Sequence, residues 1–224
     1  MKKIIDLINR NIEKFNLLPF ERKKKSKELP IITISREKRS GGRTTAYLVA
    51  KKLGKKWQVY HKEIIDKIAK EAKLEKKLVE EIDEKRLGFV DTILADFFGK
   101  RYMSLNDYYK NLTKVICEIA QRGYAIIVGR GAEYLIPHAL KVRIIGDFEQ
   151  RIEWSMEYDK LSRRKAIEYL KKLDEERIDF IKTLYKHDPR KAHHYDLVIK
   201  IGENLSIDDA ASLIFMAAKR RFKI

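Results

Sequence analysis

The sequence predicts an α/β fold in which helices cover both faces of a parallel sheet. Five short apolar runs alternate along the chain with long helical patterns, and a glycine-rich turn follows the first run. Alternation of strand and helix favours right-handed crossovers between parallel strands. Several runs, such as IITIS and AIIVG, are continuously apolar, as expected for strands that are buried on both faces.

The expected elements begin with an amphipathic helix over residues 3 to about 16, where apolar residues recur at helical spacing. A basic linker, ERKKKSKELP, follows; we interpret it as a solvated connection, with a tether for polyanions as the alternative. Strands are expected at 31–35, 57–61, 125–129, 141–146 and 196–201. Helices are expected at 44–53, as several segments within 62–122, at 148–187 with a break near 160, and at 206–220.

Composition narrows the classes of function. The 224 residues are enough for one sizeable core, and the net charge of +17 favours anionic partners. With one cysteine, Cys117, the chain can build neither an internal disulfide nor a cysteine metal site, which fits a reducing cytoplasm. Polar residues interrupt the N-terminal apolar positions and no run is long enough to span a bilayer, so neither a secretory leader nor membrane insertion is expected.

The turn after the first strand, in ITISREKRSGGRTTA (31–45), is the first candidate site. A phosphate cradle needs inward N–H groups, which glycine permits, and a helix N-terminus facing the anion. Ser40, Gly41 and Gly42 supply such a turn, and Thr44 and Thr45 begin the next helix. A plain strand-to-helix turn is the alternative.

The loop departs from the pattern GxxxxGK[ST]. In the preferred register Gly42, Arg43 and Thr44 fill the places of G, K and [ST], and Glu37 stands where the first glycine should be. A second register puts Gly42 itself at the lysine position. The first register leaves the cation of Arg43 facing the phosphates of ATP. The planar guanidinium of arginine does not simply replace the compact ammonium group of lysine.

Several later motifs appear together with this loop, in the segments TISREKRSGGR (33–43), YHKEIIDKIA (60–69), IIVGRGAEYL (126–135), FEQRIEW (148–154) and LDEERIDFIK (173–182). From about residue 30 to 215 the chain resembles the cytidylate kinase-like family, a branch of the P-loop nucleoside monophosphate kinases. The resemblance implies a three-layer α/β/α fold of the P-loop kinase type with a five-stranded parallel sheet. It also implies an ATP site at the glycine loop, a separate monophosphate site and a helical lid at about 155–190. The kinase-like domain would cover 30–224, and 1–29 would be an added helix and linker.

Phosphoryl transfer requires positive charge around the moving phosphate, so arginines near strand ends are the residues to weigh. Arg43 is the candidate for the nucleotide phosphates. Arg36, just past the first strand, is interpreted as loop scaffolding, with a phosphate contact as the alternative. Arg130 follows AIIVG directly, and the resemblance implies that it contacts the monophosphate substrate, although Val128 replaces the aspartate of the family's DGR motif. A structural salt bridge is the alternative for Arg130.

The resemblance assigns further residues to the substrate and the lid. Arg151 falls where a hinge arginine of relatives contacts phosphates. Asp174 and Arg177, three apart on one helical face, match a pair aimed at the monophosphate. Lys62 and Lys67 begin the helix after the second strand, where the family places groups facing the monophosphate.

Magnesium is expected to rely on Thr44, the phosphates and water, because no aspartate closes the third strand. The favoured function is a kinase that moves the γ-phosphate of ATP to a nucleoside monophosphate, with CMP first by resemblance. A nucleotide-binding sensor with slow or no turnover is the alternative, motivated by the departures at Glu37, Arg39, Arg43, His61, Val128 and Trp154. A nucleic-acid binder ranks third, and a homo-oligomer is left open.

Overall fold

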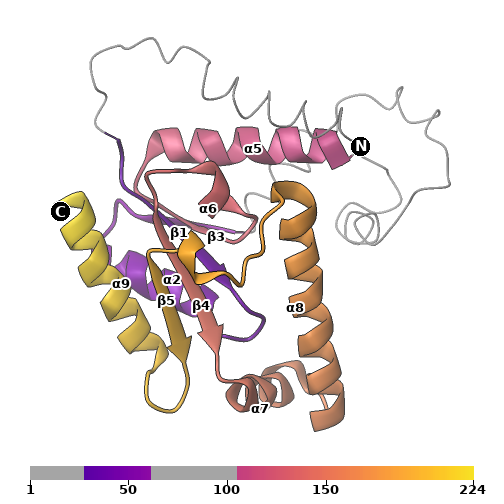
Figure 1. Ribbon diagram of the computed structural model, residues 1–224. Coiled ribbons are helices and arrows are strands. Elements are labelled where there is room, and N and C mark those ends of the chain that lie inside the picture. The colour runs from indigo at the N-terminus through magenta and orange to yellow at the C-terminus, as the bar shows by residue number, and fades with distance from the viewer. Residues whose placement is uncertain (1–27, 62–104) are drawn as a thin grey trace, which may run out of the picture.

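The computed structural model describes residues 28–61 and 105–224. The expected N-terminal helix, most of the basic linker, Lys62 and Lys67 lie outside these residues, as do the helices expected within 62–104. Figure 1 shows the elements and labels most of them. The strands are β1 (Ile31–Arg36), β2 (Gln58–Tyr60), β3 (Ala125–Val128), β4 (Leu140–Gly146) and β5 (Leu197–Ile201). The helices are α2 (Gly42–Leu53), α5 (Leu105–Arg122), α6 (Ala132–Leu135), α7 (Phe148–Asp159), α8 (Arg163–Tyr185), the 3₁₀ turn η1 (Ala192–His194) and α9 (Ile207–Phe222).

The five strands form one parallel sheet in the order β2-β3-β1-β4-β5, which confirms the predicted strands and their direction. β1 lies at the centre, paired with β3 on one side and β4 on the other. Because all strands run the same way, the loops after β1, β3 and β4 meet at one edge, where ligands of such sheets bind.

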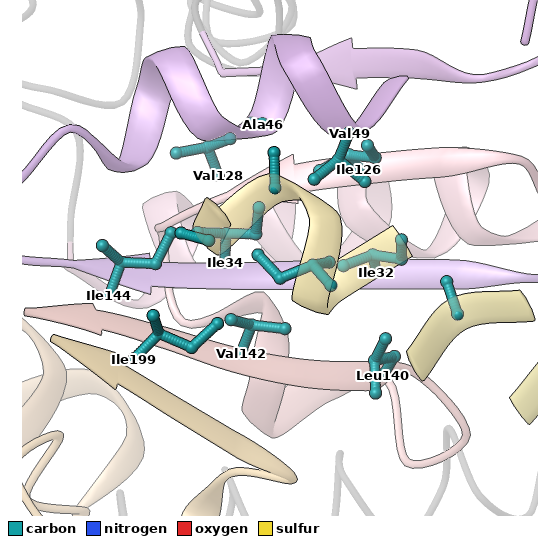
Figure 2. Close-up of a cluster of buried hydrophobic side chains, with 14 of the residues drawn as sticks. Ile32, Ile34, Ala46, Val49, Ile126, Val128, Leu140, Val142, Ile144 and Ile199 are labelled. Atoms are coloured by element: carbon teal, nitrogen blue, oxygen red, sulfur yellow. The ribbon is translucent and has the colours of Figure 1, made fainter. Parts of the chain in front are cut away.

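Two apolar layers cover the sheet, as the three-layer prediction requires. On one face α2 and α9 pack against the strands; Figure 2 shows Ala46 and Val49 of α2 beside Ile34 and Ile126. On the other face α5, α6 and the C-terminal half of α8 pack over Ile31 and Ile127. IITI of β1 is fully buried, which explains its unbroken run of apolar and β-branched residues.

α7 and α8 continue from β4 and match the helices expected over 148–187, with the break at Lys160 in the left-handed conformation. Ile152 of α7 packs against Ala166 and Leu170 of α8. Ser162 occupies the N-cap position of α8, but its side chain makes no capping hydrogen bond. Within the described ranges no helix has the length and apolar character of a membrane span.

Candidate functional site

The glycine loop, which we define as residues 37–44, runs from the end of β1 into the first turn of α2. Gly41 has φ +79° and serves as the N-cap of α2, a conformation that glycine adopts without strain. At Gly42 a Cβ would lie 2.8 Å from Cβ of Arg36, so a side chain would not fit there. Within the described part of the chain, no hydrogen bond uses the backbone N–H groups of residues 39–44. They remain available to an anion at the N-terminus of α2.

Glu37 is bound inward, away from this row of N–H groups. Its Oε2 accepts hydrogen bonds from the backbone N–H of Gly146 (3.1 Å) and from Nη1 of Arg151 (3.1 Å). Nε of Arg151 donates to the carbonyl of Lys38 (2.7 Å), and its Nη2 binds Asp174. Arg151 is only 4% exposed. It therefore fastens the glycine loop, α7 and α8 together from beneath.

Two further contacts hold the loop against α7 and α8. Arg39, with φ +57°, pairs through its guanidinium with Asp159 at the end of α7. The hydrogen bond from Arg39 is the main cause that lowers the pKa of Asp159. The backbone N–H of Lys38 donates to Oδ1 of Asp174 on α8 across 2.8 Å.

A cavity of about 430 Å³ opens beside the loop, between the ends of β1, β3 and β4 and the inner side of α8. We call it the arginine pocket. Six basic side chains line it: Arg36, Lys38, Arg130, Arg143, Arg177 and Arg190. Four carboxylates do so as well: Glu37, Glu133, Asp174 and Glu176. The lining therefore carries a surplus of two positive charges.

The cations of the pocket are not fully compensated by the protein. Arg190 is neutralised by Asp188, and this hydrogen bond lowers the pKa of the Asp188 carboxyl. Arg177 has only a 3.8 Å ion pair with Asp174, and its buried Nη1 has no hydrogen-bond partner among the described residues. Burial lowers the pKa of Arg177, with the positive charges of Arg151 and Arg130 adding to the effect. An anion entering here would relieve this repulsion.

The base of the pocket holds a buried carboxylate. Glu133, at the start of α6, is 2% exposed, and burial raises its pKa. Its Oε2 has no hydrogen-bond partner within the described ranges. Arg143 of β4 lies beside it, donates to the hydroxyl of Ser35 (3.0 Å) and packs over the ring of Tyr195.

The structure brings together three of the residues that the sequence picked out. Arg130, Asp174 and Arg177 all line the arginine pocket. Arg151 lies behind the pocket wall, with its guanidinium bonded to protein groups. Arg43 is exposed in the first turn of α2, outside the lining of the pocket.

The remaining loop residues have distinct surroundings. The hydroxyl of Ser40 is buried and donates to the carbonyl of Glu37 (3.1 Å). Thr45 is buried, and its hydroxyl donates to the carbonyl of Gly41 (3.1 Å). Thr44 is exposed. At the end of β2, His61 pairs with the hydroxyl of Tyr47 (2.8 Å).

Sequence reasoning missed Arg143, Arg190 and Glu133, and it interpreted Arg36 as scaffolding. One signal was present: KVRIIG places an arginine inside a run expected to be buried, and a buried cation needs a partner. Glu133 carried no such signal, because it belongs to a helix of four residues.

Several groups at the glycine loop would hold ATP and Mg²⁺. The unused N–H groups of residues 39–44 and the N-terminus of α2 fit a phosphate chain. Thr44 offers an exposed hydroxyl for Mg²⁺, and within the described ranges no group of three acidic, histidine or cysteine side chains forms a metal cluster. Magnesium commonly keeps water and substrate phosphates as most of its ligands, which is compatible with a single hydroxyl.

Comparison with known proteins bears directly on this site. The profile of the cytidylate kinase-like family matches residues 31–221, which is most of the chain. The chain belongs to this family. The match covers the glycine loop, the arginine pocket, α7 and α8, so the resemblance seen in separate motifs extends over one continuous fold of the P-loop kinase type.

One solved structure supports the fold. An uncharacterized protein from Eubacterium ventriosum superposes with a TM-score of 0.64 at 23% identity, covering 85% of this chain and 98% of that one. Shikimate kinase from Acinetobacter baumannii, in complex with shikimate, gives a TM-score of 0.46 at 14% identity, covering 84% and 92%. Dephospho-CoA kinase from Campylobacter jejuni gives a TM-score of 0.44 at 18% identity, covering 87% of this chain and 98% of that one. Among curated protein sequences, none matches this chain.

Proposed function

We propose that this protein is a phosphotransferase that moves the γ-phosphate of ATP to a nucleoside monophosphate, with CMP as the first acceptor to test. The carrying observation is the arginine pocket, whose lining has two surplus positive charges directly beside a loop of unused N–H groups. A phosphate monoester carries a charge of about −1.5 to −2 at neutral pH, which matches this surplus. Membership of the family supports the same reaction class.

The two halves of the site have different tasks in this proposal. The glycine loop binds the phosphates of ATP through its backbone, and Arg43 contacts them from the solvent side. Arg130 and Arg177 hold the phosphate of the acceptor, and Asp174 orients Arg177 through their ion pair. Mg²⁺, held in part by Thr44, would neutralise charge on the ATP phosphates.

The reaction needs little covalent chemistry from the protein. An oxygen of the acceptor phosphate forms a bond to the γ-phosphorus, the bond from this phosphorus to the β,γ-bridging oxygen breaks, and ADP leaves. At neutral pH the attacking oxygen is already deprotonated, so the carboxylates of the pocket are not required as a base. An ATP-dependent transferase of this kind suits the cytoplasm, which we propose as its location.

Two observations favour a second candidate, a nucleotide-binding protein with slow turnover. Asp174 already accepts the N–H of Lys38, and the loop has no lysine at the position where the usual pattern has one. In that case nucleotides would bind without product formation.

The experiment is to incubate the protein with ATP, Mg²⁺ and each of CMP, dCMP, UMP, AMP and GMP, and to follow diphosphates by chromatography. Turnover of about 1 per second or faster from one acceptor would establish the kinase and exclude the slow binder. Arg177→Met should then lower kcat/KM for the acceptor by about 100-fold, as expected when a phosphate-binding cation is removed. Arg164→Met, an exposed arginine on the same helix, is the matched control. Absence of any product, with ATP binding detected by calorimetry, would contradict the kinase.

A further inference from the structure

Arg36 occupies the junction between the glycine loop and the arginine pocket. It is the last residue of β1 and lines the pocket. Its stem lies against Gly42 at the start of α2, where an added Cβ would be 2.8 Å from Cβ and 3.2 Å from Cγ of Arg36. Its guanidinium lies over Gly129 after β3, where an added Cβ would be 2.3 Å from Nη1. One side chain therefore reaches from the loop into the pocket.

The guanidinium of Arg36 stands in an unfavourable field. Burial and the positive charges of Arg177 and Arg130 lower the pKa of Arg36 to about 9, with Glu133 opposing them. The group still carries its charge at neutral pH. Among the described residues, no hydrogen bond or ion pair engages this guanidinium, and the adjacent carboxylate of Glu37 pairs with Arg151 instead. Arg36 is half-buried and lines the cavity, so its guanidinium can bind an anion there without giving up a contact with the protein.

We infer that Arg36 binds oxygens of the phosphoryl group at the point where the donor and acceptor phosphates meet, and so supplies the cation that the glycine loop lacks. The inference rests on the proposed phosphotransfer. The aliphatic part of the Arg36 side chain packs against Gly42 and its guanidinium lies over Gly129, so the guanidinium is directed toward this junction. Arg43, by contrast, lies in the exposed first turn of α2, outside the lining of the pocket. Arginine offers several donors in one plane, which suits a group with three equatorial oxygens.

The variant that tests this is Arg36→Met, which keeps the stem against Gly42 and removes the charge. The transfer assay with ATP and the active monophosphate should show kcat lowered at least 100-fold, the size expected for loss of one transition-state contact. The melting temperature should equal or exceed that of the wild type, because the repulsion from neighbouring arginines is relieved. A structural ion pair would give the opposite change. Arg164→Met is again the control.

A second measurement decides the inference without turnover. Inorganic phosphate at increasing concentration should raise the melting temperature of the wild-type protein, because a ligand bound to the native state stabilises it. In Arg36→Met this rise should fall to less than half, whereas in Arg164→Met it should stay as in the wild type.

The outcomes separate the inference from the proposed function. A variant Arg36→Met that melts several degrees lower, or keeps both its transfer rate and its full response to phosphate, overturns the role of Arg36 and leaves the kinase intact. If Arg43→Met loses phosphate transfer completely while Arg36→Met transfers normally, the role of Arg36 is likewise overturned and the kinase proposal stands. If the wild type transfers phosphate to no monophosphate, the proposed function fails, and the response to inorganic phosphate alone supports or overturns the anion site at Arg36.

Discussion

The glycine loop and the arginine pocket lie at the same edge of the sheet, yet they offer an anion different groups. The loop offers backbone N–H groups, while Glu37 and Arg39 are held by protein partners. The pocket offers cationic side chains whose charges exceed those of its carboxylates. Of the basic residues in the segment REKRSGGR, only Arg36 and Lys38 line the pocket, whereas Arg39 and Arg43 lie outside its lining. The pocket is defined by residues from β1, β3, β4 and α8 together.

The contacts of the loop with α7 and α8 show the same difference between the loop and the pocket. Lys38 lies over the ring of Tyr169, and Arg39 is paired with Asp159, so two of the loop's cations contact α7 or α8. In the pocket, Arg36 and Arg177 instead repel one another. We therefore expect variants of the loop contacts to change mainly stability, and variants of the pocket to change mainly binding.

The largest expected effect on stability is that of Arg151→Ala. This change removes a buried guanidinium that serves Glu37, Asp174 and the carbonyl of Lys38. Breaking a buried ion pair by removing one partner costs about 3 to 5 kcal/mol. Urea denaturation should show this loss in the free energy of unfolding.

The matched control for Arg151→Ala is Arg163→Ala, whose ion pair with Glu149 is exposed on both sides. Its cost should stay below about 1 kcal/mol. Equal losses in the free energy of unfolding of the two variants would mean that Arg151 does not hold the loop against α7 and α8. The expected difference between loop variants and pocket variants would then be contradicted.

A smaller effect on stability, with a selective effect on activity, is expected for Gly129→Ala. The residue has φ +78°, and its new Cβ would meet the guanidinium of Arg36 at 2.3 Å. Backbone strain should cost about 1 to 3 kcal/mol, and displacement of Arg36 should lower transfer. The control is Gly54→Ala, which has φ +98° but nothing within 4 Å of the new Cβ. Transfer rates and unfolding curves of both variants separate the effect of backbone strain from the effect of displacing Arg36. Equal transfer activity in the two variants would contradict a role for Arg36 in the pocket.

The smallest expected effect concerns the pair of Arg39 and Asp159. The folded-state pKa of Asp159 is lowered below its ordinary value of 3.8, chiefly by the hydrogen bond from Arg39. Its contribution to stability is therefore present above pH 3.8 and lost as the pH falls through the folded-state value. Asp159→Asn should lower stability by about 1 kcal/mol at pH 7. Thermal melts at falling pH should show the two proteins converging, and a constant difference would refute the assignment.

Much of the fold could be predicted because its signals are local. The run IITI is β-branched throughout, the run AIIV is apolar, and Gly54 directly follows α2. The predicted bounds of the strands and of α2 therefore agree with the structure to within about two residues. α6 and η1 were missed because elements of three or four residues carry no periodicity.

The site was only partly predictable, because it depends on how distant segments meet. Arg130 and Arg177 were chosen from strand-end position and family motifs, and the structure places both in the pocket. Arg36 was undervalued because the sequence does not reveal that its side chain crosses Gly129. The role of Arg151 in holding the loop required contacts among β1, α7 and α8 that no local pattern encodes.

The hydrogen bond from the N–H of Lys38 to Asp174 gives this molecule an internal reporter. Any motion that carries α8 away from the loop must break this bond and open the amide to isotope exchange with solvent. The protection of one proton in deuterated water therefore measures how often the helix and the loop separate. Adding ATP or a monophosphate would show, from the same proton, which ligand holds them together.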